Sequence, residues 1–179
     1  MSPFPDRVHV RTVEGAEARA LLDELAAVLE DCVAGGASVN YMLPFSRDQA
    51  RDAFEGMVTE VELGRRLLLC AFAGDELVGT VQVVTALPPN QPHRGEIAKL
   101  LVRRDTRRRG IAQRLMAHAE AEARRAGKTL LLLDTVTGGD AERLYARMGW
   151  TRVGVVPGFA LSPDGRPCDT TYFYKSIGR

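Results

Sequence analysis

Apolar residues recur along this chain with two spacings, about every second residue in some segments and about every third or fourth in others. The first spacing predicts strands and the second predicts amphipathic helices. Strand-like segments cover residues 7–13, 66–73, 77–87, 96–102, 129–133, 151–156 and 170–175. Helical spacing covers residues 14–32, 46–63, 111–126 and 141–148. The predicted order, β-αα-βββ-α-β-α-ββ, is that of a mixed α/β domain.

Several of these segments carry signals at their ends. Ser46 and Gln49 have the spacing of a capping box, which predicts that the second helix begins there. Gly35 is expected to end the first helix, and Gly127 the third. Residues 96–102 (EIAKLLV) are apolar enough to predict a central strand.

An arginine-rich turn, RRRGIA over residues 107–112, joins that central strand to the helix that follows. The first four N–H groups of a helix lack internal partners, and the helix dipole adds partial positive charge there. Gly110 permits close approach of the backbone, and Ala112 leaves the first helical turn uncrowded. The turn therefore predicts a binding site for a di- or triphosphate.

Two other phosphate-binding loops do not match this sequence. A Walker loop requires G-x-x-x-x-G-K-[ST], and a dinucleotide fingerprint requires G-x-G-x-x-G near the first strand. The pattern R-x-x-G-x-A, formed here by Arg107, Gly110 and Ala112, resembles the coenzyme A pyrophosphate loop of the GNAT acetyltransferase superfamily. The alternative is a solvated arginine-rich turn before an ordinary helix.

The resemblance covers nearly the whole chain and implies a single GNAT acetyltransferase domain over residues 1–179, with acetyl-CoA as cosubstrate. It implies a mixed central β-sheet of about seven strands flanked by about four helices. Two central parallel strands, here 96–103 and 129–134, would splay apart to admit the pantetheine arm. Within the superfamily the chain is most similar to tabtoxin-resistance acetyltransferases. The segments that suggest this include 36–39 (GASV), 133–135 (LDT) and 163–166 (PDGR).

The same resemblance assigns cofactor binding to a set of positions. They are Leu101, Val102, Arg103, Arg107, Arg108, Arg109, Gly110, Ile111, Ala112, Gln113, Thr135 and Ala141. Two positions depart from the family pattern. In such proteins the position of Arg104 is often occupied by Pro, and that of Arg108 by Gly. These extra arginines either tighten the phosphate contact or lie in solvent.

Acetyl transfer from a thioester to an amine poses three demands. The amine must lose a proton, the tetrahedral oxyanion needs a hydrogen-bond donor, and the departing thiolate needs a proton. Tyr145 is the candidate acid, because AERLYARMGW resembles the family's A-x-x-x-Y-x-x-x-G-[FW] helix. A phenol of pKa ~10 can protonate a nascent thiolate of pKa ~8.5. The alternative is a core tyrosine on a short helix.

Glu96 and Asp134 are the candidate bases. Each is an acidic residue on, or at the end of, an otherwise apolar strand, where a carboxylate is costly to bury unless it is paired, hydrated or used. If the two strands lie side by side, both carboxylates face one cleft, and burial raises their pKa values toward those of useful bases. Alternatively, Glu96 faces solvent at a strand start and Asp134 caps the next turn. Which of the two is the primary base stays open.

The family also implies where the oxyanion donor and the acceptor lie. The donor would be a backbone N–H of Leu101 or Val102. Lys99 faces the same side of its strand as Leu101, and either meets a substrate carboxylate or pairs with an acidic neighbour. The other candidate acceptor contacts, from the loop between the first two helices and from the final hairpin, are Ser38, Asn40, Tyr41 and Phe159. The alternative for these residues is an ordinary polar loop.

Composition narrows the class of protein. The 24 Lys and Arg residues against 23 Asp and Glu residues give a net charge of +1, so no polyanionic partner is indicated. Three widely spaced cysteines fit neither a disulfide framework nor a metal site, and favour a reducing, cytoplasmic setting. The start, MSPFPDRVHV, has no apolar signal core, and the longest apolar stretch, residues 67–73, is far below the ~20 residues of a membrane helix.

The implied function is an N-acetyltransferase that moves the acetyl group of acetyl-CoA directly to a primary amine of a small molecule in a ternary complex. A toxin or antibiotic resembling tabtoxinine-β-lactam is one candidate acceptor. A protein or peptide acetyltransferase and a catalytically idle acetyl-CoA-binding protein remain alternatives. Nucleic-acid binding through RRDTRRR is disfavoured, because the run is short and has no interleaved aromatics. A homodimer that exchanges C-terminal strands would be compatible with the family.

Overall fold

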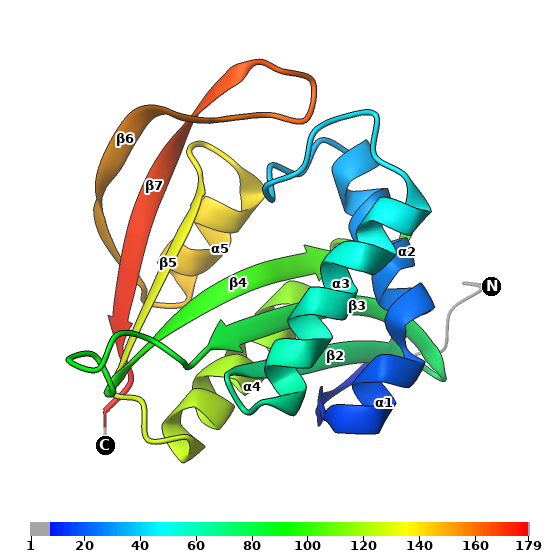
Figure 1. Cartoon of the computed structure of the whole chain (residues 1–179). Coiled ribbons are helices and arrows are strands. Elements are labelled where there is room, and N and C mark those ends of the chain that lie inside the picture. The colour runs from blue at the N-terminus through cyan, green and yellow to red at the C-terminus, as the bar shows by residue number, and fades with distance from the viewer. Residues whose placement is uncertain (1–7, 179) are drawn as a thin grey trace.

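One mixed sheet organises the protein (Figure 1), which a computed structural model describes over residues 8–178. The strands are β1 (Val8–Val13), β2 (Arg66–Ala73), β3 (Glu76–Val84), β4 (Arg94–Val102), β5 (Leu130–Val136), β6 (Thr151–Leu161) and β7 (Pro167–Ser176). The α-helices are α1 (Gly15–Ala20), α2 (Leu22–Ala34), α3 (Arg47–Glu62), α4 (Ile111–Arg125) and α5 (Asp140–Arg147). A short 3₁₀ turn, η1 (Arg104–Thr106), precedes α4.

The order of strands in the sheet is β1-β2-β3-β4-β5-β7-β6. All neighbours run antiparallel except β4 and β5, which are parallel. That parallel pairing is short: it joins Arg94, Gly95 and Glu96 to residues 130–132 and then stops, although both strands continue. Beyond Glu96 the two strands diverge (Figure 1), as the sequence predicted.

Two apolar clusters, one on each face of the sheet, hold the helices in place. The first joins α1, α2 and α3 to the sheet and includes Leu25, Phe54 and Leu68. The second joins α4 and α5 to the opposite face and includes Leu115 and Phe173. Both clusters are closed to solvent, because the side chains named here are each at most 1% exposed. Burial of these faces is the main favourable contribution to folding.

The predicted order of elements is confirmed, with one helix more than expected. The predicted first helix is two helices, because the chain turns at Leu21, between α1 and α2. Apolar spacing could not reveal this break, since a one-residue turn leaves the periodicity on either side nearly unchanged. The capping box at Ser46 and Gln49 is confirmed, with each side chain bonded to the other residue's backbone N–H. Strand β5 runs two residues past Asp134, which therefore lies within the strand.

No helix within residues 8–178 combines the length and the apolar character needed to cross a membrane.

A glycine at the β3–β4 contact generates the first testable prediction. A Cβ added at Gly79 would lie 2.8 Å from the backbone oxygen of Leu101, where β4 irregularly pairs with β3. We expect Gly79→Ala to lower the free energy of unfolding by roughly 1–3 kcal/mol, because the neighbouring backbone would have to shift. Urea denaturation measures this change.

Gly56→Ala is the matched control. Gly56 lies within α3, and an added Cβ there meets no atom within 4 Å. This variant should keep or raise stability by up to about 1 kcal/mol, since Ala is the better helix former. Equal stability of the two variants would contradict the close strand contact.

Candidate functional site

The arginine-rich turn and the start of α4 form one end of the site. Gly110 is the N-cap of α4 and has a left-handed backbone with φ of 74°. Space does not explain this glycine, because an added Cβ would meet nothing within 4 Å. The left-handed conformation does, since it disfavours side chains. The first intrahelical bond runs from the Arg114 N–H to the Gly110 oxygen, at 3.1 Å, so the preceding amides of the helix have no partner inside it.

A cavity of about 680 Å³ opens beside this helix end. Nine of the twelve predicted cofactor positions line it: Leu101, Val102, Arg107, Arg108, Gly110, Ile111, Ala112, Gln113 and Ala141. The cavity therefore runs from the end of β4, past the turn, to the start of α5. An open strand edge, helix amides and arginines in one cavity suit a long ligand that carries phosphate groups.

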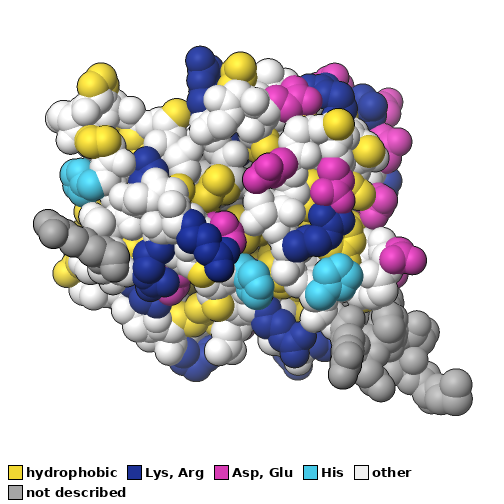
Figure 2. Space-filling view, turned by 90° about the horizontal axis from the view of Figure 1, so that it is seen from below, with side chains coloured by type: hydrophobic (Ala, Val, Ile, Leu, Met, Phe, Trp, Pro, Cys, Tyr) yellow, Lys and Arg dark blue, Asp and Glu magenta, His cyan; other side chains and the backbone are white. Residues whose placement is uncertain are grey.

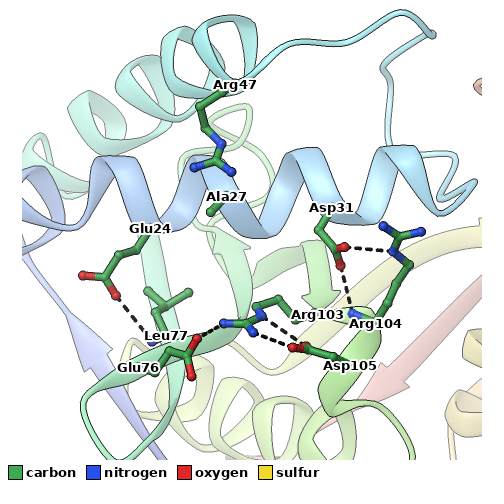
Figure 3. A pocket seen from close by; sticks show the side chains of 9 residues that line it. All are labelled: Glu24, Ala27, Asp31, Arg47, Glu76, Leu77, Arg103, Arg104 and Asp105. Carbon is green, nitrogen blue, oxygen red and sulfur yellow. Dashed lines mark hydrogen bonds and ion pairs between the residues drawn. The ribbon is translucent and has the colours of Figure 1, made fainter.

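Three predicted cofactor positions lie outside that lining. Thr135 pairs with Thr171 of β7 in the strand ladder, and neither Thr135 nor Arg109 is among the lining residues. Arg103 bonds Glu76 and Asp105 in a second pocket on the far side of the η1 turn (Figure 3). Its side chain is thus directed away from the predicted cofactor path, because two carboxylates compete for its guanidinium.

The second pocket, shown in Figure 3, anchors the turn. Asp31 of α2 accepts hydrogen bonds from the backbone N–H of Arg104, at 2.9 Å, and from its Nε, at 2.8 Å. This pair holds η1 against α2. Burial raises the pKa of the Asp31 carboxyl, but the hydrogen bonds from the Arg104 backbone N–H and guanidinium outweigh it and hold that pKa below its usual value. Acidic and basic side chains neutralise each other throughout this pocket.

Arg107 bridges the turn and the end of β4. Its Nε donates to the backbone oxygen of Val102 at 3.0 Å, and its Nη2 approaches the Cys32 sulfur at 3.8 Å. The side chain is exposed to the cavity, so it can also reach a bound anion. Arg108 has a left-handed backbone with φ of 63°, which is uncommon for a residue other than glycine.

The negative charge of Glu96 on β4 acts on Asp134 on β5, so the two carboxylates lie near each other. That both face one cleft stays a prediction. Glu96 accepts a hydrogen bond from Arg94 at 2.7 Å. Asp134 is exposed to solvent by its surface area. Even so, partial desolvation by the surrounding protein raises the pKa of its carboxyl. The negative charge of Glu96 adds to this rise, and the positive charge of Lys99 opposes it.

Tyr145 on α5 lies deeper than a simple surface acid would. It is 5% exposed, and its ring centroid lies 6.0 Å from those of both Trp150 and Phe173. Burial, followed by the charge of Asp134, raises the pKa of its phenol. The hydroxyl therefore stays protonated at neutral pH. The lining of the large cavity includes its neighbour Leu144 but does not include Tyr145, among the residues that the structure describes.

The predicted acceptor residues gather where the loop over residues 35–46 meets the β6–β7 hairpin. Ser38 donates to the backbone oxygen of Leu161 at 3.2 Å, and the Leu43 N–H donates to that of Pro163 at 2.9 Å. These bonds close the loop against the hairpin at the upper edge of Figure 1.

The remaining acceptor candidates differ in their surroundings. Tyr41 stacks on Phe45, and Lys99 places its ammonium 5.2 Å from the Tyr41 ring centre. Phe159 meets the edge of the Tyr172 ring, with 5.9 Å between centroids, and stays half-exposed. Asn40 is exposed with φ of 79°, a conformation that asparagine tolerates in turns.

Sequence reasoning missed several residues of this region. Tyr172 lies directly across from Asp134 on β7, and both candidate bases raise the pKa of its phenol after burial does. Arg143 and Arg147 of α5 line the large cavity. The 3.6-residue spacing of α5 could have indicated a shared face for the two arginines, whereas the pairing of β7 with β5 has no local signal.

Figure 2 shows the face of the molecule that is seen from below the view of Figure 1. On that face, Lys and Arg side chains are interspersed with Asp and Glu side chains and do not form a continuous basic strip. Within residues 8–178, no group of three or more His, Cys, Asp or Glu side chains is arranged to hold a metal ion.

Comparison with known proteins agrees with this geometry. The profile of the Acetyltransferase (GNAT) family matches residues 37–150. An N-acetyltransferase from Staphylococcus aureus Mu50 shares 16% identity at a TM-score of 0.78, covering 96% of this chain and 99% of that one. A Salmonella typhimurium protein provisionally described as an acetyltransferase, and solved with its cofactor acetyl-CoA, shares 17% identity at a TM-score of 0.77, covering 96% and 95%.

A further solved structure, provisionally named as a phosphinothricin N-acetyltransferase, shares 17% identity at a TM-score of 0.78 and covers 97% of this chain and 100% of that one. At such identities the structural likeness shows the fold, whereas the profile match extends over more than half of the chain. The chain therefore belongs to the GNAT family of acetyltransferases, enzymes that use acetyl-CoA as the acetyl donor.

Proposed function

We propose that this enzyme acetylates the primary amine of a small molecule by direct transfer in a ternary complex. The observation that carries the proposal is the divergence of β4 and β5 beside the basic start of α4, with two carboxylates at the point of divergence. A thioester held along β4 would then lie close to a base. Proximity of this kind removes much of the entropic barrier of a two-substrate reaction.

A closed acceptor side favours a small molecule over a peptide. The bonds from Ser38 to Leu161 and from Leu43 to Pro163 join the loop to the hairpin across the region where a peptide would need an open groove. A toxin or antibiotic acceptor of the tabtoxinine-β-lactam kind is the finer form of this proposal. It is supported by the sequence resemblance and by the fold shared with the structure named as a phosphinothricin N-acetyltransferase.

We assign the primary base to Asp134. Its pKa is raised, so the carboxylate holds a proton more readily than an ordinary aspartate does. Glu96 instead forms an ion pair with Arg94, which holds its carboxylate in place. In this assignment Glu96 raises the basicity of Asp134 and holds a water between them, while Tyr145 donates a proton to the departing thiolate. A backbone N–H of Leu101 or Val102 would bond the acetyl oxygen.

Removal of the Arg107 side chain tests the cofactor site. We expect Arg107→Ala to weaken acetyl-CoA binding by about 10- to 100-fold, because a charge-assisted hydrogen bond contributes about 1.5–3 kcal/mol. Isothermal titration calorimetry gives the dissociation constant. The control is Arg125→Ala at the other end of α4, where the arginine pairs only with Glu122 among the described residues. Unchanged affinity in the Arg107 variant would remove this residue from the site.

The base assignment predicts a ranking of two variants. Asp134→Asn should lower kcat/KM by about 10²- to 10⁴-fold, the usual contribution of a general base, and Glu96→Gln should lower it less. In the wild type, kcat/KM should fall as the pH drops through the raised pKa of Asp134, because only the ionised carboxylate accepts a proton. The reverse ranking would transfer the role to Glu96.

The same substitution has a predicted effect on stability. A carboxyl whose pKa is raised by folding destabilises the folded state at pH values above that pKa, where it must be charged. Asp134→Asn removes this charge, so its melting temperature at pH 7 should equal or exceed that of the wild type. Loss of activity in this variant could then not be ascribed to unfolding.

The role of Tyr145 has a separate test. Tyr145→Phe should lower kcat by about 10- to 100-fold, as for loss of a general acid, with little change in the dissociation constant of acetyl-CoA. The removed atom is the hydroxyl oxygen, so packing against Trp150 and Phe173 should persist. Turnover at the wild-type rate would show that this tyrosine is a core residue only.

A further inference from the structure

Two cations, Arg66 and Lys99, lie half-buried on the acceptor side of the sheet without a carboxylate partner. Arg66 begins β2 and Lys99 lies on β4. No Asp or Glu oxygen of residues 8–178 forms an ion pair with either of them. Arginines elsewhere contrast with this, since the adjacent Arg65 pairs with Glu60. Glu60 acts on Arg66, and Asp134 on Lys99, only from beyond ion-pair distance. Burying a charge without a direct partner is costly, so an anion from outside the chain would be bound favourably here.

The backbone directs Lys99 to this place. Between Gln82 and Thr80 of β3 the register with β4 shifts, because Ala98 pairs with the first and Leu101 with the second. Two residues of β4 thus oppose one of β3, which is a β-bulge. Lys99 lies in the bulge with φ of 51°, an uncommon conformation for its residue type. Its ammonium then donates to the Val39 oxygen at 2.8 Å, in the acceptor loop.

Arg66 has a buried donor without a partner. Its Nη1 is bonded to the side chain of Gln82, but its Nε is buried and has no hydrogen-bond partner. A buried guanidinium N–H without a partner loses its hydration without compensation, which is uncommon in folded proteins. The neighbouring Gln82 donates to the Met57 sulfur, so it is held in place from α3.

The charge of Arg66 acts on Lys99 and on Tyr41. Burial and then the charge of Arg66 lower the pKa of Lys99 to about 8, while Asp134 raises it. Arg66 also acts on Tyr41, which Lys99 faces at 5.2 Å. The strand pairing agrees, because Arg66 bonds Gln82, and Gln82 pairs with Ala98, the residue before Lys99. A stacked aromatic pair, Tyr41 and Phe45, lies beside Lys99.

We infer that Arg66 and Lys99, beneath Tyr41, bind an acidic group of the acceptor, so that the enzyme selects an amine that also carries a compact oxyanion such as a carboxylate or phosphonate. This inference rests on the proposed function and narrows its substrate class. The negative charge of Asp134 also acts on Lys99 and raises the pKa of its ammonium. The anion would therefore lie at the Arg66 side of Lys99, and the amine toward Asp134, an arrangement that matches an amino acid or an aminoalkylphosphonate.

The test compares acids with their neutral counterparts. Acetyl transfer is measured for L-amino acids and for the carboxamide of each, and for 2-aminoethylphosphonate against ethanolamine. The wild type should prefer the acidic member of at least one pair by 10-fold or more in kcat/KM. Arg66→Gln and Lys99→Gln should each reduce that preference about 10-fold, mainly through KM, and Lys99→Arg should restore part of it. The phosphonate pair separates a carboxylate site from a general oxyanion site.

Arg65→Gln is the matched control, because Arg65 is adjacent in sequence, exposed and paired with Glu60. It should leave the preference for acids unchanged. Equal treatment of acids and neutral amines by the wild type, or a preference that survives in both the Arg66 and Lys99 variants, would overturn the inference. Thermal denaturation should show that Arg66→Gln folds as well as the wild type, since it removes an unpaired buried donor.

A binding experiment, which does not depend on acetyl transfer, distinguishes failure of this inference from failure of the proposed function. With the enzyme saturated with CoA, which cannot transfer an acetyl group, calorimetry measures binding of the same acids and carboxamides. Binding of acids that is lost in Arg66→Gln, without transfer to any amine, would reject the proposed function and keep the anion site. Transfer to neutral amines with no binding of acids would keep the function and reject the anion site.

Discussion

The separation of β4 from β5 is the constraint on which the rest of the structure depends. Backbone N–H and C=O groups must be paired or hydrated, and the two parallel strands share only a short ladder before they diverge. From residue 97 onward β4 therefore presents an edge toward β5 that β5 does not fill. A ligand with amide groups along its length can pair with such an edge as an added strand does. The cavity and the turn lie in line with this edge.

The arginines around the turn divide into those that hold the structure and those that face the cavity. Arg103 and Arg104 are bonded to carboxylates on the α2 side and fix η1 in place. Arg107 and Arg108 line the large cavity, and Arg104 contributes to its lining as well. The arginine-rich run over residues 103–109 thus both fixes the η1 turn through ion pairs and places positive charge at the cavity. Carboxylates neutralise the first pair, whereas Arg107 and Arg108 stay exposed.

On the acceptor side, by contrast, the charged groups Arg66, Lys99 and Asp134 have no direct ion-pair partner among the described residues. The pKa of the Asp134 carboxyl is also raised. Such groups cost folding free energy in the absence of a ligand. Proteins tolerate this cost at functional sites, where unpaired donors and acceptors are completed by the substrate.

The sequence determined the order of elements, the capping box at Ser46, the central strand and the turn at Gly110, because each depends on residues close together in the chain. It also marked Glu96 and Asp134 as acidic residues on otherwise apolar strands, but whether they meet depends on how the two strands pair. Only the tertiary structure decided that Arg103 turns away, that Tyr172 opposes Asp134, that Tyr145 is buried, and that Arg66 lies beside Lys99. These outcomes depend on long-range pairing, on the bulge in β4 and on competition among carboxylates, none of which leaves a periodic trace in the sequence.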